Sequence, residues 1–202
     1  MTMTGKSRGS YAKTAGRRRE ILEAGIEVFA NHGFRNGSLR EIAERVGMSQ
    51  AGLLHHFSNK NELLAGVLEL RDERSAVIVK LDETPGIDTI RGIVRVAEYN
   101  AAFAPGLVEL HCVLSAEATA PEHPAHRYFL DRYTWVVGLM IKAFSNAQVA
   151  GQLTAAVDPQ SAARSLIALS DGLQVQWLLA PDSLDMAEEL RRYLRPLFTV
   201  EF

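Results

Sequence analysis

The chain has 202 residues, of which 47% are hydrophobic and 23% charged, a composition that suits a globular protein with a substantial core. Every apolar run is shorter than the roughly 18 residues that span a bilayer, and no apolar stretch follows the basic N-terminal residues. We therefore expect neither a membrane helix nor a secretory signal. The single cysteine, Cys112, excludes an intramolecular disulfide framework and favours a reducing, cytoplasmic location.

The net charge of −2 conceals an uneven distribution of charge along the chain. Residues 1–60 contain ten Lys or Arg and five Glu, a balance of +5, whereas residues 61–202 contain twelve Lys or Arg and nineteen acids, a balance of −7. A polyanion site needs clustered cations rather than a high overall pI, so the basic front end is compatible with phosphate binding. A solubilising N-terminal segment would explain the charge equally well, and the motifs have to decide.

The N-terminal quarter of the chain begins with a polar stretch and continues with helical periodicity. Residues 1–13 are small, polar and without apolar repeats, which predicts a disordered basic arm. From about residue 14 apolar side chains recur at i, i+4 and i+7, as at Leu22, Ile26 and Phe29, which predicts an amphipathic helix. Gly33 is placed to end that helix.

Two short helices are expected next, joined by a tight turn between positions 39 and 58. Ser38 and Glu41 form a capping-box pattern at the start of the first helix, and Ser49 can cap the second. Ala43 leaves room for the second helix to approach, and Gly47 supplies the positive φ that such a turn requires. This spacing predicts a helix-turn-helix, with a plain helical hairpin as the alternative.

Beyond residue 60 the chain continues as helices separated by breakers. These fall at Pro85-Gly86, Pro105-Gly106, Pro121 to Pro124, Gly151, Asp158-Pro159 and Pro181-Asp182. No sustained alternation of period two argues for strands, so the sequence predicts an all-α fold of about nine helices. The predicted units are the arm at 1–13, a three-helix unit with the helix-turn-helix at 14–60, and a larger helical domain at 61–202.

The helix-turn-helix segment resembles that of the tetracycline-repressor (TetR) family. The resemblance is carried by Leu39-Arg40-Glu41-Ile42-Ala43, Gly47-Met48-Ser49 and Leu53-Leu54-His55-His56-Phe57-Ser58-Asn59-Lys60, with Ala24, Phe29, Gly33 and Phe34 before them. It implies that residues 14–60 are the DNA-binding domain and residues 61–202 the ligand-binding and dimerisation domain of a dimeric transcriptional regulator. Such a regulator is most often a repressor that binds a palindromic operator and is released by a small-molecule effector. Many members have Tyr where this chain has Leu54, which puts one phosphate contact in doubt, and Gly52 is unusual inside a reading helix.

The first turn of the second short helix is expected to face base edges in the major groove. There Gln50 can bond adenine and Ala51 can meet a thymine methyl, while phosphates are expected at Ser38, Arg40 and Lys60. The predicted DNA-contacting set is Ser38, Arg40, Ser49, Gln50, Ala51, Gly52, Leu54, His55, His56 and Lys60. Lys13, Arg17, Arg18 and Arg19 either contact DNA as well or form a solvated helix face.

The resemblance also implies an effector pocket and a dimer interface in the larger domain. The candidate pocket residues are Tyr99, Phe103, His111, Tyr133, Trp135, Met140 and Trp177. For each of them the alternative is that it is simply part of the hydrophobic core. Apolar stripes in the last two long helices predict a four-helix interface that contains Leu166, Leu169, Leu173, Leu190, Leu194 and Leu197, with intramolecular core as the alternative.

Two other classes of function have weaker support in the sequence. An enzyme could use a metal held by His123 and His126, but no third ligand lies near them in the sequence. It could also use a thiol–imidazole pair of His111 and Cys112, but neighbouring residues on a helix do not face each other. We therefore expect no catalysis, metal or cofactor. A non-specific architectural DNA-binding protein is the other alternative, and the acidic body argues against it.

Overall fold

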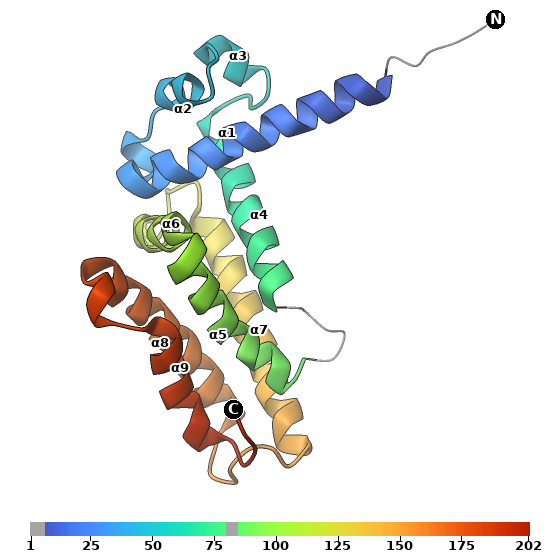
Figure 1. Cartoon of the computed structure of the whole chain (residues 1–202), viewed down its shortest axis with the longest axis vertical. Coiled ribbons are helices and arrows are strands. Elements are labelled where there is room, and N and C mark those ends of the chain that lie inside the picture. The colour runs from blue at the N-terminus through green and yellow to red at the C-terminus, as the bar shows by residue number, and fades with distance from the viewer. Residues whose placement is uncertain (1–6, 80–84) are drawn as a thin grey trace, which may run out of the picture.

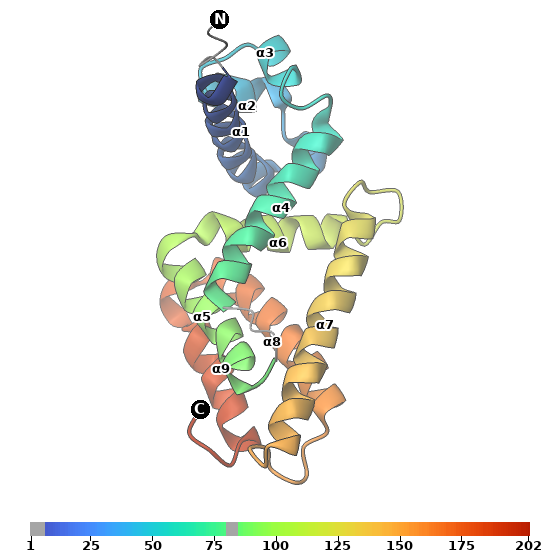
Figure 2. The same cartoon turned by 90° about the vertical axis from the view of Figure 1, so that its right-hand side faces the viewer.

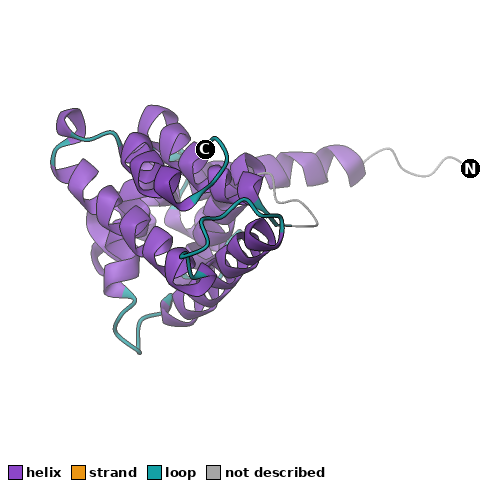
Figure 3. Cartoon of the chain, turned by 90° about the horizontal axis from the view of Figure 1, so that it is seen from below, coloured by secondary structure: helices purple, strands orange, loops and turns teal. Residues whose placement is uncertain are grey.

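The computed structural model describes the backbone of residues 7–79 and 85–202, and the side chains from residue 14 onward within those ranges. The described chain is helical with no β-strand, as Figure 3 shows; an isolated bridge joins Leu153 to Phe198. This confirms the predicted all-α fold with about nine helices. The helices are α1 (Ser7–Asn36), α2 (Leu39–Arg45), α3 (Gln50–Leu54), α4 (Lys60–Val79), α5 (Ile87–Phe103), α6 (Pro105–Glu117), α7 (His126–Val149), α8 (Pro159–Leu179) and α9 (Met186–Leu194), with short 3-10 turns at Pro181–Ser183 and Arg195–Leu197.

The molecule is elongated, with α1, α2 and α3 at one end (Figure 1). Helix α4 leads from this end into the body, where α5, α7, α8 and α9 run along the long axis (Figure 2). Helix α6 lies across the molecule between the two parts and packs against α1. None of the described helices combines the length and the apolar character needed to cross a membrane.

Side-chain caps fix the helix starts that the sequence predicts. The hydroxyls of Ser38 and Ser49 accept from the N–H groups of Arg40 and Gly52, and the carboxylate of Asp158 accepts from the N–H of Ser161. The capping box at Ser38 is half formed, because the Glu41 carboxylate pairs with Arg45 at 3.1 Å.

Two helix boundaries differ from the prediction. Helix α1 begins at Ser7, so the predicted arm overlaps its first turns, while residues 1–6 lie outside the described part. Gly33 has φ 69°, the left-handed conformation that glycine adopts without a Cβ penalty, and it kinks α1 instead of ending it. The chain then returns to helix as far as Asn36.

The core has two parts, one for each end of the molecule. The first joins α1–α4 to α6 and the start of α7, and the second joins α5, α7, α8 and α9. Four of the leucines predicted for a dimer interface lie in the second part: Leu166, Leu173, Leu190 and Leu194 are at most 4% exposed. Their burial favours the alternative of an intramolecular core, because side chains covered by their own chain offer little surface to a partner. Leu169 and Leu197 are half-buried against the same core.

Candidate functional site

The turn between α2 and α3 has the geometry of a helix-turn-helix. Gly47 adopts φ 65° with open space where a Cβ would stand, and the N–H of Met48 donates to the carbonyl of Ala43 at 2.9 Å. Ile42, Ala43 and Leu53 are at most 1% exposed and anchor both helices on α1. These contacts fix α3 with its first turn at the surface.

The outer face of α3 consists of residues predicted to contact DNA. Gln50, Ala51 and His55 are exposed, Leu54 is 39% exposed, and Gly52 and His56 are half-buried. Ser38 and Ser49 are exposed N-caps, so their helix N-termini are open to an anion. The predicted DNA-contacting residues of α2 and α3 thus gather at one end of the molecule (Figure 1).

Gly52 lies in the middle of α3 without an intramolecular need for glycine. A Cβ built there would stand 3.4 Å from the hydroxyl oxygen of Ser49 and 3.9 Å from Cβ of Met48, which is ordinary contact. An alanine would therefore fit the free chain. The reason for glycine has to lie in what approaches this helix from outside, or in chance.

Two arginines of α1 fasten that helix to the helix-turn-helix. Arg17 donates to the backbone carbonyl of Val46 at 2.6 Å and also pairs with Glu20. Arg18 donates to the carbonyl of His56, and its guanidinium lies 3.9 Å from the centroid of the Phe57 ring. The sequence suggested two interpretations of these arginines, DNA contact or a solvated helix face. Neither includes the intramolecular role that Arg17 and Arg18 have in the structure.

Two predicted phosphate contacts have intramolecular partners. Arg40 pairs with Glu44 at 3.4 Å on the exposed face of α2. Such a solvent-exposed ion pair is weak, so a phosphate can replace Glu44 as the partner of Arg40. Lys60 donates to the carbonyl of Arg35 at 3.2 Å and lies 4.6 Å from the ring centroid of Phe34. Burial lowers the pKa of the Lys60 ammonium despite the opposing charge of Glu117.

The body contains a cavity of about 530 Å³ between α4, α5, α6, α7, α8 and α9. Of the predicted pocket residues, His111, Tyr133 and Trp135 line it. The other four do not. Tyr99 and Phe103 form an exposed ring pair on α5, Met140 is fully buried in the core, and Trp177 packs against that core from the side.

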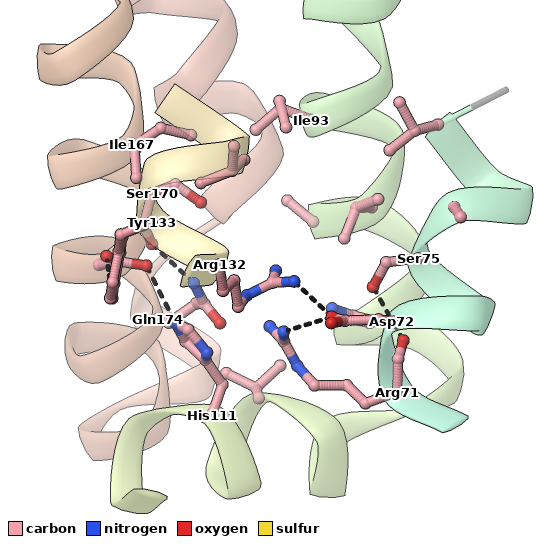
Figure 4. Close-up of a pocket in the computed structure, with 18 of the residues that line it drawn as sticks. Arg71, Asp72, Ser75, Ile93, His111, Arg132, Tyr133, Ile167, Ser170 and Gln174 are labelled. Atoms are coloured by element: carbon pink, nitrogen blue, oxygen red, sulfur yellow. Dashed lines mark hydrogen bonds and ion pairs between the residues drawn. The ribbon is translucent and has the colours of Figure 1, made fainter. Parts of the chain in front are cut away.

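A cluster of charged groups lies in one part of this cavity (Figure 4). The Asp72 carboxylate on α4 accepts from Arg71 at 3.3 Å, from the hydroxyl of Tyr128 at 2.6 Å, and from Arg132 of α7. Arg71 is only 7% exposed. Burial raises the pKa of the Tyr128 hydroxyl to about 12, so this group stays a donor.

A second polar group lies on the opposite wall. The Asp171 carboxylate of α8 accepts from Nε2 of His111 at 3.0 Å and from the hydroxyl of Tyr133 at 2.7 Å. Burial, together with the nearby charge of Arg71, lowers the pKa of His111 to about 4, so the imidazole is neutral near pH 7. Its proton then resides on Nε2, and Nδ1 is a buried acceptor without a hydrogen-bond partner in the described part of the chain.

Helix α6 connects this cavity to the helix-turn-helix end. His111 lies on the cavity side, and six residues later the Glu117 carboxylate accepts from the backbone N–H of Phe34 at 2.8 Å. Phe34 follows the kink at Gly33, so the last helical turn of α6 holds the end of α1. No simple sequence pattern signals this contact between residues 83 positions apart.

The side chains weighed as catalytic groups have structural roles. His123 accepts from the N–H of Ala125 through Nδ1 at 3.2 Å, and Nδ1 of His126 donates to the carbonyl of Ala118 at 2.7 Å. Both therefore stabilise the loop between α6 and α7. Burial raises the pKa of the Cys112 thiol to about 11, which opposes a nucleophilic thiolate. Within the described residues no group of three or more His, Cys, Asp or Glu could hold a metal.

Two family models match the chain. Residues 21–67 match bacterial regulatory proteins of the tetR family, and residues 108–199 match the C-terminal domain of BetI-type transcriptional repressors. The regulator TtgR of Pseudomonas putida is 25% identical over 187 residues, which cover 88% of this chain and 87% of TtgR. The repressor AcnR of Corynebacterium diphtheriae is 38% identical over 63 residues, 31% of this chain and 33% of AcnR. The crystal structure of a TetR-family regulator from a Rhodococcus species has a TM-score of 0.71 and 25% identity, covering 92% of this chain and all of that one.

Proposed function

Since the chain belongs to the TetR family of bacterial regulatory proteins, we propose that it binds a palindromic operator as a homodimer and releases it when a small molecule enters the cavity. DNA binding and transcriptional regulation follow from the family. The relatives found are regulators and not enzymes. The operator symmetry, the dimer and the effector are our proposal.

The observation that carries the proposal is the position of α6. One wall of the cavity and the contact to the end of α1 lie on the same short helix, through His111 and Glu117. A ligand that favours a different position of α6 therefore changes the position of the helix-turn-helix relative to the body. In a dimer this changes the separation of the two reading helices, which has to match one turn of DNA, roughly 34–36 Å.

The dimer surface that we propose is the outer stripe of α8. Ala168, Gly172, Val175 and Leu179 are exposed and follow one another at helical spacing. Val175 is 49% exposed and Leu179 81%, and the space around a Cβ at Gly172 is empty, so the backbone of a partner helix has room to approach. These residues replace the four buried leucines as the expected interface.

The direct test is selection of bound DNA from a random pool, followed by competition of the selected site against random DNA. We expect a motif with two-fold symmetry that survives an excess of competitor. Retention of random DNA as strong as that of the selected site would instead indicate an architectural DNA-binding protein.

The dimer is tested by sedimentation of Val175→Glu beside a matched control. A buried glutamate in a self-complementary interface is expected to give a monomer. Val149→Glu, at a position 90% exposed at the end of α7, is expected to leave the dimer intact. A dimeric Val175→Glu variant would show that the interface lies elsewhere.

A further inference from the structure

Arg71 is a buried cation with too few partners inside the protein. The residue is 7% exposed, and its one salt bridge within the described chain is the 3.3 Å contact with the carboxylate of its neighbour Asp72. The Tyr128 hydroxyl also interacts with it, but a guanidinium has five N–H donors, and buried charges are normally paired and hydrogen-bonded. Arg71 lines the cavity, so its remaining donors are open to an acceptor that enters there.

Asp72 is itself shared between two cations. Arg132, whose side chain is 15% exposed, forms its salt bridge with the same carboxylate, and the Tyr128 hydroxyl donates to the second oxygen. Two guanidinium groups thus share one carboxylate. The cluster of Arg71, Asp72 and Arg132 carries a surplus of one positive charge on this wall of the cavity.

Asp171, the nearest acid on the other wall, does not supply the missing acceptor. No contact of 4.0 Å or less joins it to Arg71 among the described residues, and each of its oxygens already accepts from His111 or Tyr133. His111 is neutral and adds no cation there, because its pKa is lowered to about 4. Glu69 and Glu73 also line the cavity, but both are exposed, so water screens them.

The rest of the cavity wall is mainly apolar. Figure 4 shows Arg71, Asp72 and Arg132 gathered toward the α6 end, with Ile93 and Ile167 at the other end. With a volume of about 530 Å³ the cavity accommodates a small organic molecule with a polar head and an apolar body.

We propose that the cavity binds an organic carboxylate with a largely apolar body, whose carboxylate accepts hydrogen bonds from the open donors of Arg71. This pairing gives the second guanidinium of the cluster its own anion, in the planar geometry that arginine and carboxylate share. The body of the ligand extends toward Ile93 and Ile167. The inference rests on the proposed function only in that the bound acid is the effector; the binding itself is independent of DNA.

The test compares molecules that differ only in the head group. Binding of 4-phenylbutanoate, 4-phenylbutan-1-ol and 4-phenylbutylamine to the full chain is measured by calorimetry at pH 7, and the series is repeated with octanoate, octanol and octylamine. We expect the acid of at least one series to bind about tenfold more tightly than its alcohol, with the amine weakest.

Two substitutions at Arg71 and one control locate the head group. Arg71→Met keeps the apolar length of the side chain and is expected to reduce the acid-to-alcohol affinity ratio to about one, while Arg71→Lys retains part of the preference. Arg127→Met removes an exposed arginine of α7 and is expected to change nothing. Thermal unfolding of each variant shows that it folds, and if Arg71→Met does not, Arg71→Lys and the wild-type series still decide.

The outcomes separate this inference from the proposed function. Equal affinities of acid and alcohol in both series, absence of binding by either acid, or strongest binding by the amine would each overturn the inference. Selective binding of an acid that leaves the affinity for the selected operator unchanged would support the inference and contradict the proposed role of the cavity as the effector site.

Discussion

Gly52 allows the position of the DNA interface to be tested with one methyl group. The free chain has room for an alanine side chain at this position, since a Cβ there makes only ordinary contacts of 3.4 Å and 3.9 Å. Alanine is favoured over glycine in a helix by about 1 kcal/mol, so Gly52→Ala should stabilise the free protein by up to that amount. For a chain of this size the melting temperature should rise by roughly 2–4 °C.

DNA binding should change in the opposite direction. If the backbone of α3 approaches the duplex at Gly52, the added methyl group meets a sugar or base and holds the helix away. A loss of about 1–3 kcal/mol, the cost of one disturbed base contact, corresponds to a loss of affinity of roughly 5-fold to 150-fold. The assay is fluorescence anisotropy with the selected operator at fixed salt, beside thermal unfolding.

Gly138→Ala is the matched control. Gly138 is a helical glycine of α7 with open space around its Cβ position, and α7 lies in the body and not beside α3 (Figure 1), so alanine should stabilise the chain without affecting DNA affinity. Unchanged operator affinity in Gly52→Ala, together with the expected rise in stability, would refute the argument that the glycine permits close approach of DNA.

Three further predictions concern single side chains. Gln50→Ala should relax base preference at one operator position by about 1–3 kcal/mol, measured by repeating the DNA selection. The pKa of His111 is lowered from its ordinary value of 6.5 to about 4 in the folded chain. The unfolded chain therefore takes up a proton first, so the contribution of His111 to the free energy of unfolding should be complete above pH 6.5 and lost as the pH falls toward 4. Denaturation at several pH values should show that His111→Gln loses less stability over this range than the wild type. Glu117→Ala leaves the N–H of Phe34 without its acceptor, which should cost about 1–3 kcal/mol in urea unfolding and reduce the effect of a bound ligand on DNA affinity.

The helix-turn-helix was predictable because its signals are local. Ser38, Gly47 and Ser49 act on residues within five positions of themselves, through caps and a positive φ, and the structure has each of them in its expected role. The roles of Arg17 and Arg18 were not predictable in this way. Their partners are backbone carbonyls 29 and 38 residues away, and a carbonyl leaves no mark in the sequence.

The charged residues of the cavity were still harder to predict, because they also meet only through contacts between distant parts of the chain. The predicted pocket residues include His111 and Tyr133, which do line the cavity, but not the charged residues Arg71, Asp72 and Arg132. Arg132 and Asp72 are 60 positions apart and meet only after α4 and α7 have packed. In the sequence each is one more charged residue of a helix, where a solvent-exposed position is the usual interpretation.

The sequence could not separate a dimer interface from an intramolecular core at these leucines for a related reason. An apolar stripe predicts that a helix buries one face, but the stripe is the same whether the face packs against its own chain or a partner. In α8 the large side chains Leu166 and Leu173 face the core, and the outer stripe with Gly172 and Val175 has a weaker hydrophobic signal. Small residues that let two helices approach are recognised as a surface only after the inner face has been accounted for.

The position of Gly33 bears on the coupling that we propose between the cavity and the helix-turn-helix. Helix α6 rises about 9 Å over the six residues from His111 to Glu117, so a displacement at the cavity reaches Phe34 through little more than one and a half turns of rigid helix. The Glu117 carboxylate accepts a hydrogen bond from the N–H of Phe34, the residue directly after the kink in α1. Gly33 interrupts α1 directly before Phe34, so the last turn of α1 is not continuous with the long helix before it. In the coupling that we propose, the Glu117–Phe34 hydrogen bond therefore adds a polar link to the apolar packing of α1 against α6.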